Sequence, residues 1–113
     1  MKTAKYYPGQ SIGARPIHEV ISHQYVRTLV REAKKGNIIP PILVDGEIGN
    51  CNLLAGTHRL AANELLQKLG QEPLIPVREI STIPEPYRSE ILDAVESDSY
   101  SVVEYIFLKS LKH

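Results

Sequence analysis

The sequence predicts a small α+β domain in which helices pack against a mixed β-sheet. Apolar residues recur at helical spacing in some stretches and form short strand-like runs in others, and glycines and prolines separate them. With 113 residues, of which 42% are hydrophobic, the chain has room for one core and not for two. We expect residues 1–15 to form an irregular N-terminal arm and residues 16–113 to form a single domain.

The first predicted elements are a short strand and an amphipathic helix. Pro16 fixes the start of a strand that continues to about Ile21. Apolar residues then fall at helical spacing over residues 23–35. Gly36 and Asn37 supply the signal that ends this helix.

A hairpin and a second helix follow. Ile42–Val44 is typical of a buried strand, and Cys51–Ala55 of its antiparallel partner, with glycines in the turn between them. The next helix is expected from Thr57 to Leu69. Its predicted buried residues are Ala61, Ala62, Leu65, Leu66 and Leu69.

One more strand and a short helix come next. Leu74–Ile80 is a strand, and its internal Pro76 predicts a place at the sheet edge or at the end of the strand. Pro84 and Pro86 open a short helix that ends near Glu96.

The last predicted helix begins around residues 99–101, where Ser101 and Glu104 have the spacing of a capping box. Its apolar stripe is wider than a surface helix needs, because Val102, Tyr105 and Leu108 extend it. Packing on the domain's own sheet explains this width, and so does a homodimer or partner surface. Both interpretations remain open.

Composition limits the classes of function. The chain has 13 Lys and Arg and 13 Asp and Glu, so its formal net charge is zero, which argues against a uniformly basic surface for nucleic acid. No membrane partner is expected, because no stretch approaches the roughly 18–20 apolar residues of a membrane span and the start lacks the apolar run of a secretory signal. Cys51 is the single cysteine, which favours a reducing cytoplasm and a buried, unreactive side chain.

The stretch with the clearest chemistry is residues 54–62, a strand that enters a helix through Gly56. Such a junction presents backbone N–H groups and the positive end of a helix dipole to one small volume, which suits phosphate. Arg59 adds a fork of donors matched to phosphate oxygens, and His58 donates a ring N–H when neutral. The alternative is that Gly56 simply turns the chain and Arg59 pairs with a carboxylate.

The order of these parts resembles the ParB/sulfiredoxin-like superfamily over roughly residues 15–80. In that group a strand and a helix lead to an Ile-Pro-Pro-Ile-like strand, a hairpin, and a loop–helix with the pattern Gly-x-His/Arg-Arg-x-x-Ala. The matching segments here are residues 39–42, the hairpin 42–55 and residues 56–62. The resemblance implies a bound nucleotide, ATP or CTP. The residues implied to hold its phosphates are Gly56, Thr57, His58 and Arg59, with Thr28 as a weaker match.

Free-serine kinases within this superfamily carry a histidine before the loop arginine, as His58 precedes Arg59 here, and a glutamate ahead of the first helix. The resemblance implies that Glu19 is the general base of a phosphoryl transfer or nucleotide hydrolysis, if the chain is an enzyme. Otherwise Glu19 is a charged strand-end residue or a partner of Arg15 or Arg59. Mg²⁺ would accompany the nucleotide, and no metal site formed by the protein alone is predicted. The carboxylates considered for Mg²⁺ are Asp45, Glu47 and Glu19.

The chain departs from its relatives in two ways. Sulfiredoxins have a nucleophilic cysteine where this chain has Thr57, and a hydroxyl does not replace a thiolate, so sulfiredoxin activity is not expected. Partition-type ParB proteins continue into a helix-turn-helix region, whereas only two short helices are predicted here after the last strand. Sequence-specific operator binding by this chain alone is therefore not expected.

The alternative function is a non-catalytic DNA- or protein-binding module of partition or mobile-element type. The first helix carries four basic residues, several of them one turn apart, which would contact a phosphate backbone. These residues are Arg27, Arg31, Lys34 and Lys35. A solvated helix face explains the same pattern.

Overall fold

The computed structural model describes residues 5–8, 14–16, 22–37, 39–71 and 74–112. Its strands are β1 (Lys5–Pro8), β2 (Ala14–Pro16), β3 (Ile42–Glu47), β4 (Asn50–Ala55) and β5 (Leu74–Glu79). Its helices are α2 (His23–Lys34), α3 (Thr57–Lys68), the 3₁₀ turn η1 (Ile80–Thr82), α4 (Tyr87–Glu96) and α5 (Tyr100–Ser110). The predicted α+β class, with a mixed sheet and two C-terminal helices, is confirmed.

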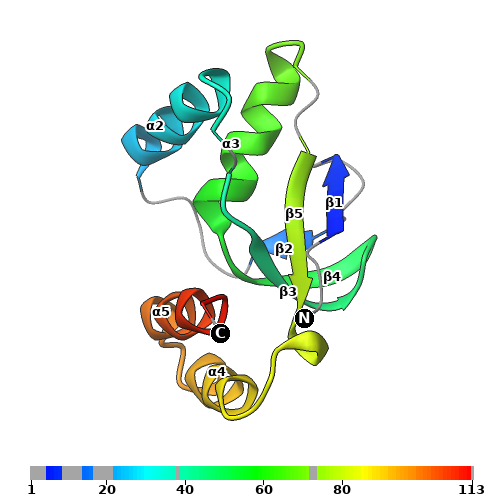
Figure 1. Ribbon diagram of the computed structural model, residues 1–113, viewed down its shortest axis with the longest axis vertical. Coiled ribbons are helices and arrows are strands. Elements are labelled where there is room, and N and C mark those ends of the chain that lie inside the picture. Colours follow the sequence, from blue (N-terminus) through cyan, green and yellow to red (C-terminus); the bar gives the residue numbers. More distant parts are fainter. Residues whose placement is uncertain (1–4, 9–13, 17–21, 38, 72–73, 113) are drawn as a thin grey trace.

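The described strands form one five-stranded sheet in the order β1-β5-β3-β4-β2. Neighbouring strands are antiparallel in the β1–β5 and β3–β4 pairs and parallel in the β3–β5 and β2–β4 pairs. Helices α2 and α3 lie together at one end of the molecule, and α4 and α5 lie together at the other (Figure 1).

The predicted irregular arm over residues 1–15 is wrong, because its described parts belong to the sheet. β1 pairs with β5, and β2 pairs with β4, so both segments form the outer strands. Their partners lie far along the chain, and such pairing leaves no local pattern in a short segment. The remainder of the first predicted strand, residues 17–21, lies outside the described residues.

The expected edge position of β5 is also wrong for the strand as a whole, which lies between β1 and β3. Pro76 is nevertheless tolerated for a local reason. It faces Tyr6 of β1, whereas the pairing of β5 with β3 begins one residue later, at Val77. At Pro76, β5 is paired with β1 and not yet with β3. The N–H that proline lacks is therefore missing at a point where only one neighbouring strand pairs with β5.

A β-bulge in the predicted hairpin bends the strand that leads into the candidate site. Val44 pairs with Leu53 and Leu43 pairs with Ala55, so Leu54 is an extra residue in β4. Such a bulge bends its strand and redirects the side chains that follow. Here it lies directly before Gly56, at the entrance to α3.

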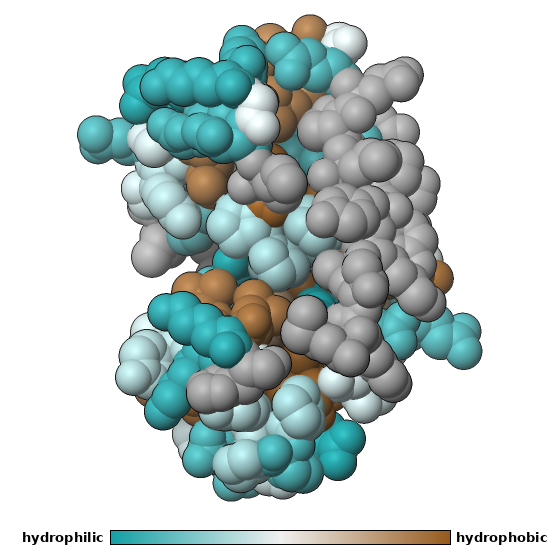
Figure 2. Space-filling model, in the orientation of Figure 1, coloured by the Kyte–Doolittle hydropathy of each residue, from teal (hydrophilic) through white to brown (hydrophobic). Residues whose placement is uncertain are grey.

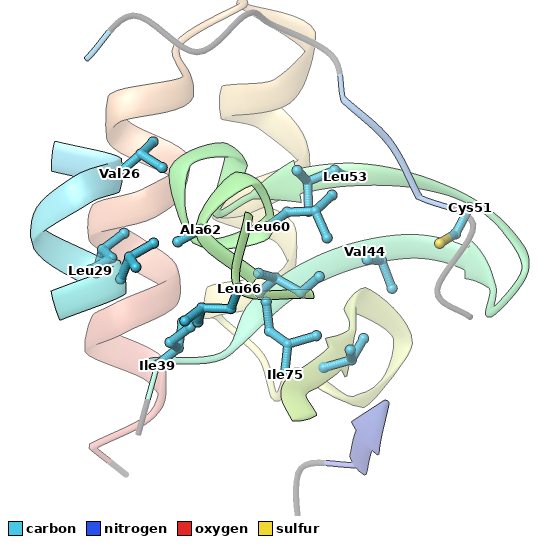
Figure 3. Close-up of a cluster of buried hydrophobic side chains, with 13 residues drawn as sticks. Val26, Leu29, Ile39, Val44, Cys51, Leu53, Leu60, Ala62, Leu66 and Ile75 are labelled. Carbon is cyan, nitrogen blue, oxygen red and sulfur yellow. The ribbon is translucent and has the colours of Figure 1, made fainter. Parts of the chain in front are cut away.

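The core consists of two hydrophobic clusters on opposite faces of the sheet, because consecutive residues of β3 enter alternate clusters. In the first cluster, Val26 and Leu29 of α2 point toward Ala62 of α3 (Figure 3). Cys51 belongs to this cluster and is 1% exposed, as expected of a buried cysteine. In the second cluster, Phe107 of α5 packs with Leu54 of β4.

The predicted buried face of α3 needs correction at its end. Leu69 is 54% exposed, because the helix ends at Lys68 and Leu69 caps it. Leu60 and Asn63 are buried instead. The buried surface extends around the helix because α3 contacts α2 as well as β3 and β5.

The predicted capping box at the last helix is wrong. Helix α5 starts at Tyr100 with Ser99 as its N-cap, so Ser101 lies inside the helix, and Glu104 has a different partner, described below. Packing within the domain accounts for Val103 and Phe107, both fully buried. The residues that widen the stripe remain exposed, namely Val102, Tyr105 and Leu108. Hydrophobic side chains gather over this helix in Figure 2.

In the part of the chain that the structure describes, no helix combines the length and the hydrophobicity that crossing a bilayer requires.

Candidate functional site

Gly56 occupies a position that only glycine fills without strain. Its φ of +103° is in the region that L side chains rarely adopt. A Cβ there would lie 2.6 Å from Cγ2 of Ile42 and 2.9 Å from both Nε and Nη2 of Arg59. The guanidinium of Arg59 therefore packs directly against the backbone of Gly56.

Helix α3 starts at this glycine. Its first helical hydrogen bond runs from the N–H of Leu60 to the carbonyl oxygen of Gly56, at 2.8 Å. Gly56 is the N-cap and offers no side chain to the first turn. Helix geometry directs the first-turn N–H groups and the positive end of the dipole beyond this terminus.

Arg59 is held by a carboxylate from the C-terminal helix. Its Nη2 donates to Oε2 of Glu104 at 2.8 Å, and the two side chains are 6% and 35% exposed. The alternative considered for Arg59, a carboxylate partner, is thus present. The sequence pattern assigned Glu104 to a capping box, so this pairing was not foreseen.

His58 is oriented by the start of α2. Its Nε2 accepts a hydrogen bond from the backbone N–H of Ser22 at 3.2 Å, and its ring lies 5.5 Å from that of Tyr25. Because Nε2 accepts, the ring proton of the neutral imidazole is on Nδ1.

A cavity of about 560 Å³ lies where the start of α3 meets α5. Figure 1 shows α5 (red) opposite the first turn of α3 (green). The lining combines apolar and aromatic walls with a few polar groups, as is typical of small-molecule sites. The residues that line it are Tyr25, Leu54, Ala55, Gly56, Thr57, His58, Arg59, Tyr100, Ser101, Glu104 and Leu108.

The structure brings together four of the residues predicted to bind phosphate, since Gly56–Arg59 all line the cavity. Thr28 does not line it. The Thr28 hydroxyl donates to the carbonyl oxygen of Gln24 at 3.1 Å and accepts from Arg31 at 3.2 Å. Glu19, the predicted general base, lies outside the described residues.

Two of the three carboxylates considered for Mg²⁺, Asp45 and Glu47, are not among the described residues that line the cavity. Asp45 and Glu47 are on β3, where they pair in register with Asn52 and Asn50 of β4. Among the described residues, no group of three or more His, Cys, Asp or Glu side chains could hold a metal ion.

The contribution of α5 to the cavity was missed. Tyr100, Ser101, Glu104 and Leu108 lie on one face of this helix, at the spacing of successive turns. That spacing is visible in the sequence, but nothing local indicates that this face meets the start of α3. Desolvation, followed by the negative charge of Asp98, raises the pKa of the Tyr100 phenol above its ordinary value, so it stays neutral in this wall.

The basic residues of α2 and of its C-cap, Lys35, form a separate surface. Arg27, Arg31, Lys34 and Lys35 are all exposed and outside the cavity. Glu32 partly offsets their charge through an ion pair with Lys35, whose Nζ lies 3.7 Å from Oε1. Hydrophilic side chains cover this end of the molecule in Figure 2.

Comparison with known proteins finds no family model that matches the chain and no curated protein that matches it.

Proposed function

We propose that this chain is a nucleotide-binding domain of the ParB/sulfiredoxin-like type, with the nucleotide phosphates held at Gly56–Arg59. One observation carries the proposal. The start of α3 and the buried guanidinium of Arg59 line the same cavity, which has about 560 Å³ of space. A helix N-terminus and an arginine directed to one volume favour a phosphate group.

The remaining walls suit the rest of a nucleotide. Tyr25 of α2 and Tyr100 of α5 offer aromatic rings, and Leu54 of β4 and Leu108 of α5 offer apolar surface. A nucleobase packs on such surfaces, while phosphate oxygens accept from the first-turn N–H groups and from Arg59, with His58 beside them.

The proposal extends to ATP or CTP as the ligand, with Mg²⁺ bound through the phosphates. The reaction class that fits it is phosphoryl transfer or nucleotide hydrolysis. Glu19 is the proposed base by resemblance alone. A cytoplasmic setting is proposed because the single cysteine is buried and unsuited to a disulfide framework.

A thermal-shift panel tests the proposal. ATP, ADP, CTP and GTP, each with and without Mg²⁺, are added to the wild type and to Arg59→Ala. A ligand at a hundred times its dissociation constant adds about 2.7 kcal/mol to stability, which such a scan detects. Stabilisation of the wild type that Arg59→Ala loses is the expected result.

The matched control is Lys68→Ala, which removes one positive charge from the exposed far end of the same helix. It is expected to respond as the wild type does. If no nucleotide stabilises the wild type, the proposal fails.

The second candidate is a DNA- or protein-binding module, favoured by the exposed basic surface of α2. DNA retention that falls with rising salt, and that the double variant Arg27→Ala/Arg31→Ala loses, would support it. The double variant Lys68→Ala/Lys109→Ala removes the same charge elsewhere and serves as its control. A homodimer through the exposed apolar face of α5 also remains a proposal.

A further inference from the structure

Glu104 is the ion-pair partner of the Arg59 guanidinium, which a bound phosphate would need. Of the described residues that line the cavity, Arg59 and Glu104 carry the formal charges, and they are paired at 2.8 Å. The charges of this pair cancel, although the shape and donors of the cavity suit an anion.

A phosphate that enters the cavity can contact Arg59 in one of two ways. It either shares Arg59 with the Glu104 carboxylate, which places two anions side by side in a partly desolvated space, or it replaces that carboxylate. Like charges in contact repel strongly where water is limited. Exchange of one anion for the other at Arg59 is favoured.

The two partners differ in their freedom to move. Arg59 is 6% exposed and packs against Gly56, where a Cβ would lie 2.9 Å from its Nε, so the guanidinium is fixed by its surroundings. Glu104 is 35% exposed, and Arg59 is its hydrogen-bond partner. Glu104 can turn toward water without burying an unpaired charge.

We propose that Glu104 is a positioning residue that competes with the ligand for Arg59, so that binding requires the carboxylate to leave. This inference rests on the proposed function, because it concerns the same anion site. The carboxylate holds the guanidinium in place when the cavity is empty, and it weakens the affinity of every ligand that must displace it by the same factor. The ligands favoured in practice are those with further contacts, such as nucleoside diphosphates and triphosphates.

The test compares the wild type with Glu104→Gln by calorimetric titration. The ligands are inorganic phosphate and the mono-, di- and triphosphate of the nucleotide that binds best. Glutamine keeps the size of the side chain and removes its charge. We expect Glu104→Gln to bind on the order of tenfold tighter, the scale of one charged hydrogen bond. The gain should be equal across the ligand series.

The control is Glu96→Gln, which makes the same charge change at an exposed position of α4 and should leave affinity unchanged. Unchanged or weaker binding by Glu104→Gln would overturn the inference while leaving the proposed function intact. A gain that rises with ligand charge would also overturn it, since this indicates a carboxylate that stays and repels. Absence of binding by both proteins would reject the proposed function and this inference together.

Discussion

Gly56 is the residue on which the geometry of the site depends. Its positive φ starts α3 directly after the bulge of β4, and its missing side chain lets Arg59 lie against the backbone. The sequence pointed to Gly56 because a glycine between a strand and a helix is typical of a turn that needs a positive φ. It did not reveal that the guanidinium fills the space of the absent Cβ.

Gly56→Ala is therefore expected to destabilise the protein by about 2–4 kcal/mol, combining the strain of a positive φ with overpacking against Ile42. Urea unfolding measures the loss. Gly70→Ala is the matched control, because Gly70 also has a positive φ, of +85°, but a Cβ there meets nothing within 4 Å. Equal losses in the two variants would show that close packing at Gly56 is unimportant.

Asn63 shows where sequence reasoning at the residue scale fails. It was not among the predicted buried residues of α3, yet it is 0% exposed, and its Nδ2 and Oδ1 have no hydrogen-bond partner within the described ranges. A buried amide without partners weakens a fold, whereas an apolar side chain of similar size does not.

We expect Asn63→Leu to leave the free energy of unfolding unchanged or to raise it by about 1 kcal/mol, since the desolvation penalty of the amide disappears. Chemical denaturation checks this. Gln24→Leu, at an exposed amide side chain on α2, is the control for the change in composition. A loss greater than about 2 kcal/mol in Asn63→Leu would mean that the amide does stabilise the native state.

Individual helices and strands could be predicted where their sequence pattern is local. The bounds of α2 and α3 agree with the predicted helices within one residue, and the hairpin lies where its glycines indicated. The start of α5 at Tyr100 lies within the predicted range of residues 99–101, but the capping box was wrong because a spacing of three residues matched that motif by chance. β1 was missed because strand pairing depends on partners elsewhere in the chain, whereas β2 overlaps the start of the first predicted strand.

The start of α4 provides a test at the scale of one element. Oε1 of Glu85 accepts from the hydroxyl of Ser89 at 2.9 Å, and its Oε2 accepts from the N–H of Ser89 at 3.2 Å. The hydroxyl bond of Ser89 is the largest cause that lowers the pKa of Glu85, followed by the N–H bond and by Arg88. A lowered pKa means that the charged form stabilises the fold above the ordinary pKa of the carboxyl and loses this effect as pH falls through the lowered value.

Glu85→Gln is therefore expected to unfold at a lower temperature than the wild type at neutral pH, and the gap should close in acid as the wild-type carboxyl becomes protonated. Thermal unfolding at a series of pH values, from pH 7 down to strongly acidic pH, measures this difference in unfolding temperature. Glu64→Gln, an exposed change on α3, should show no such gap. A gap that stays constant over the whole range would contradict the role of the Glu85 charge.

At the scale of the molecule, the cavity exists because segments distant in the sequence meet. The junction of β4 and α3 supplies Gly56–Arg59, α2 supplies Tyr25, and α5 supplies Glu104 and its neighbours. The part formed by Gly56–Arg59 was accessible from the sequence, since these residues are contiguous. The part from α5 was not, because a tertiary contact such as that between Arg59 and Glu104 leaves no mark in either segment alone.

The measurement that tests the central claim most directly is an NMR titration of the uniformly ¹⁵N-labelled protein with ATP and with CTP, each in the presence of Mg²⁺. The account predicts that the largest amide shift changes cluster at Gly56–Arg59, with smaller changes at Tyr25 and on the cavity side of α5, and that Arg59→Ala removes them. Shift changes confined to the basic residues of α2, or none at saturating nucleotide, would contradict it.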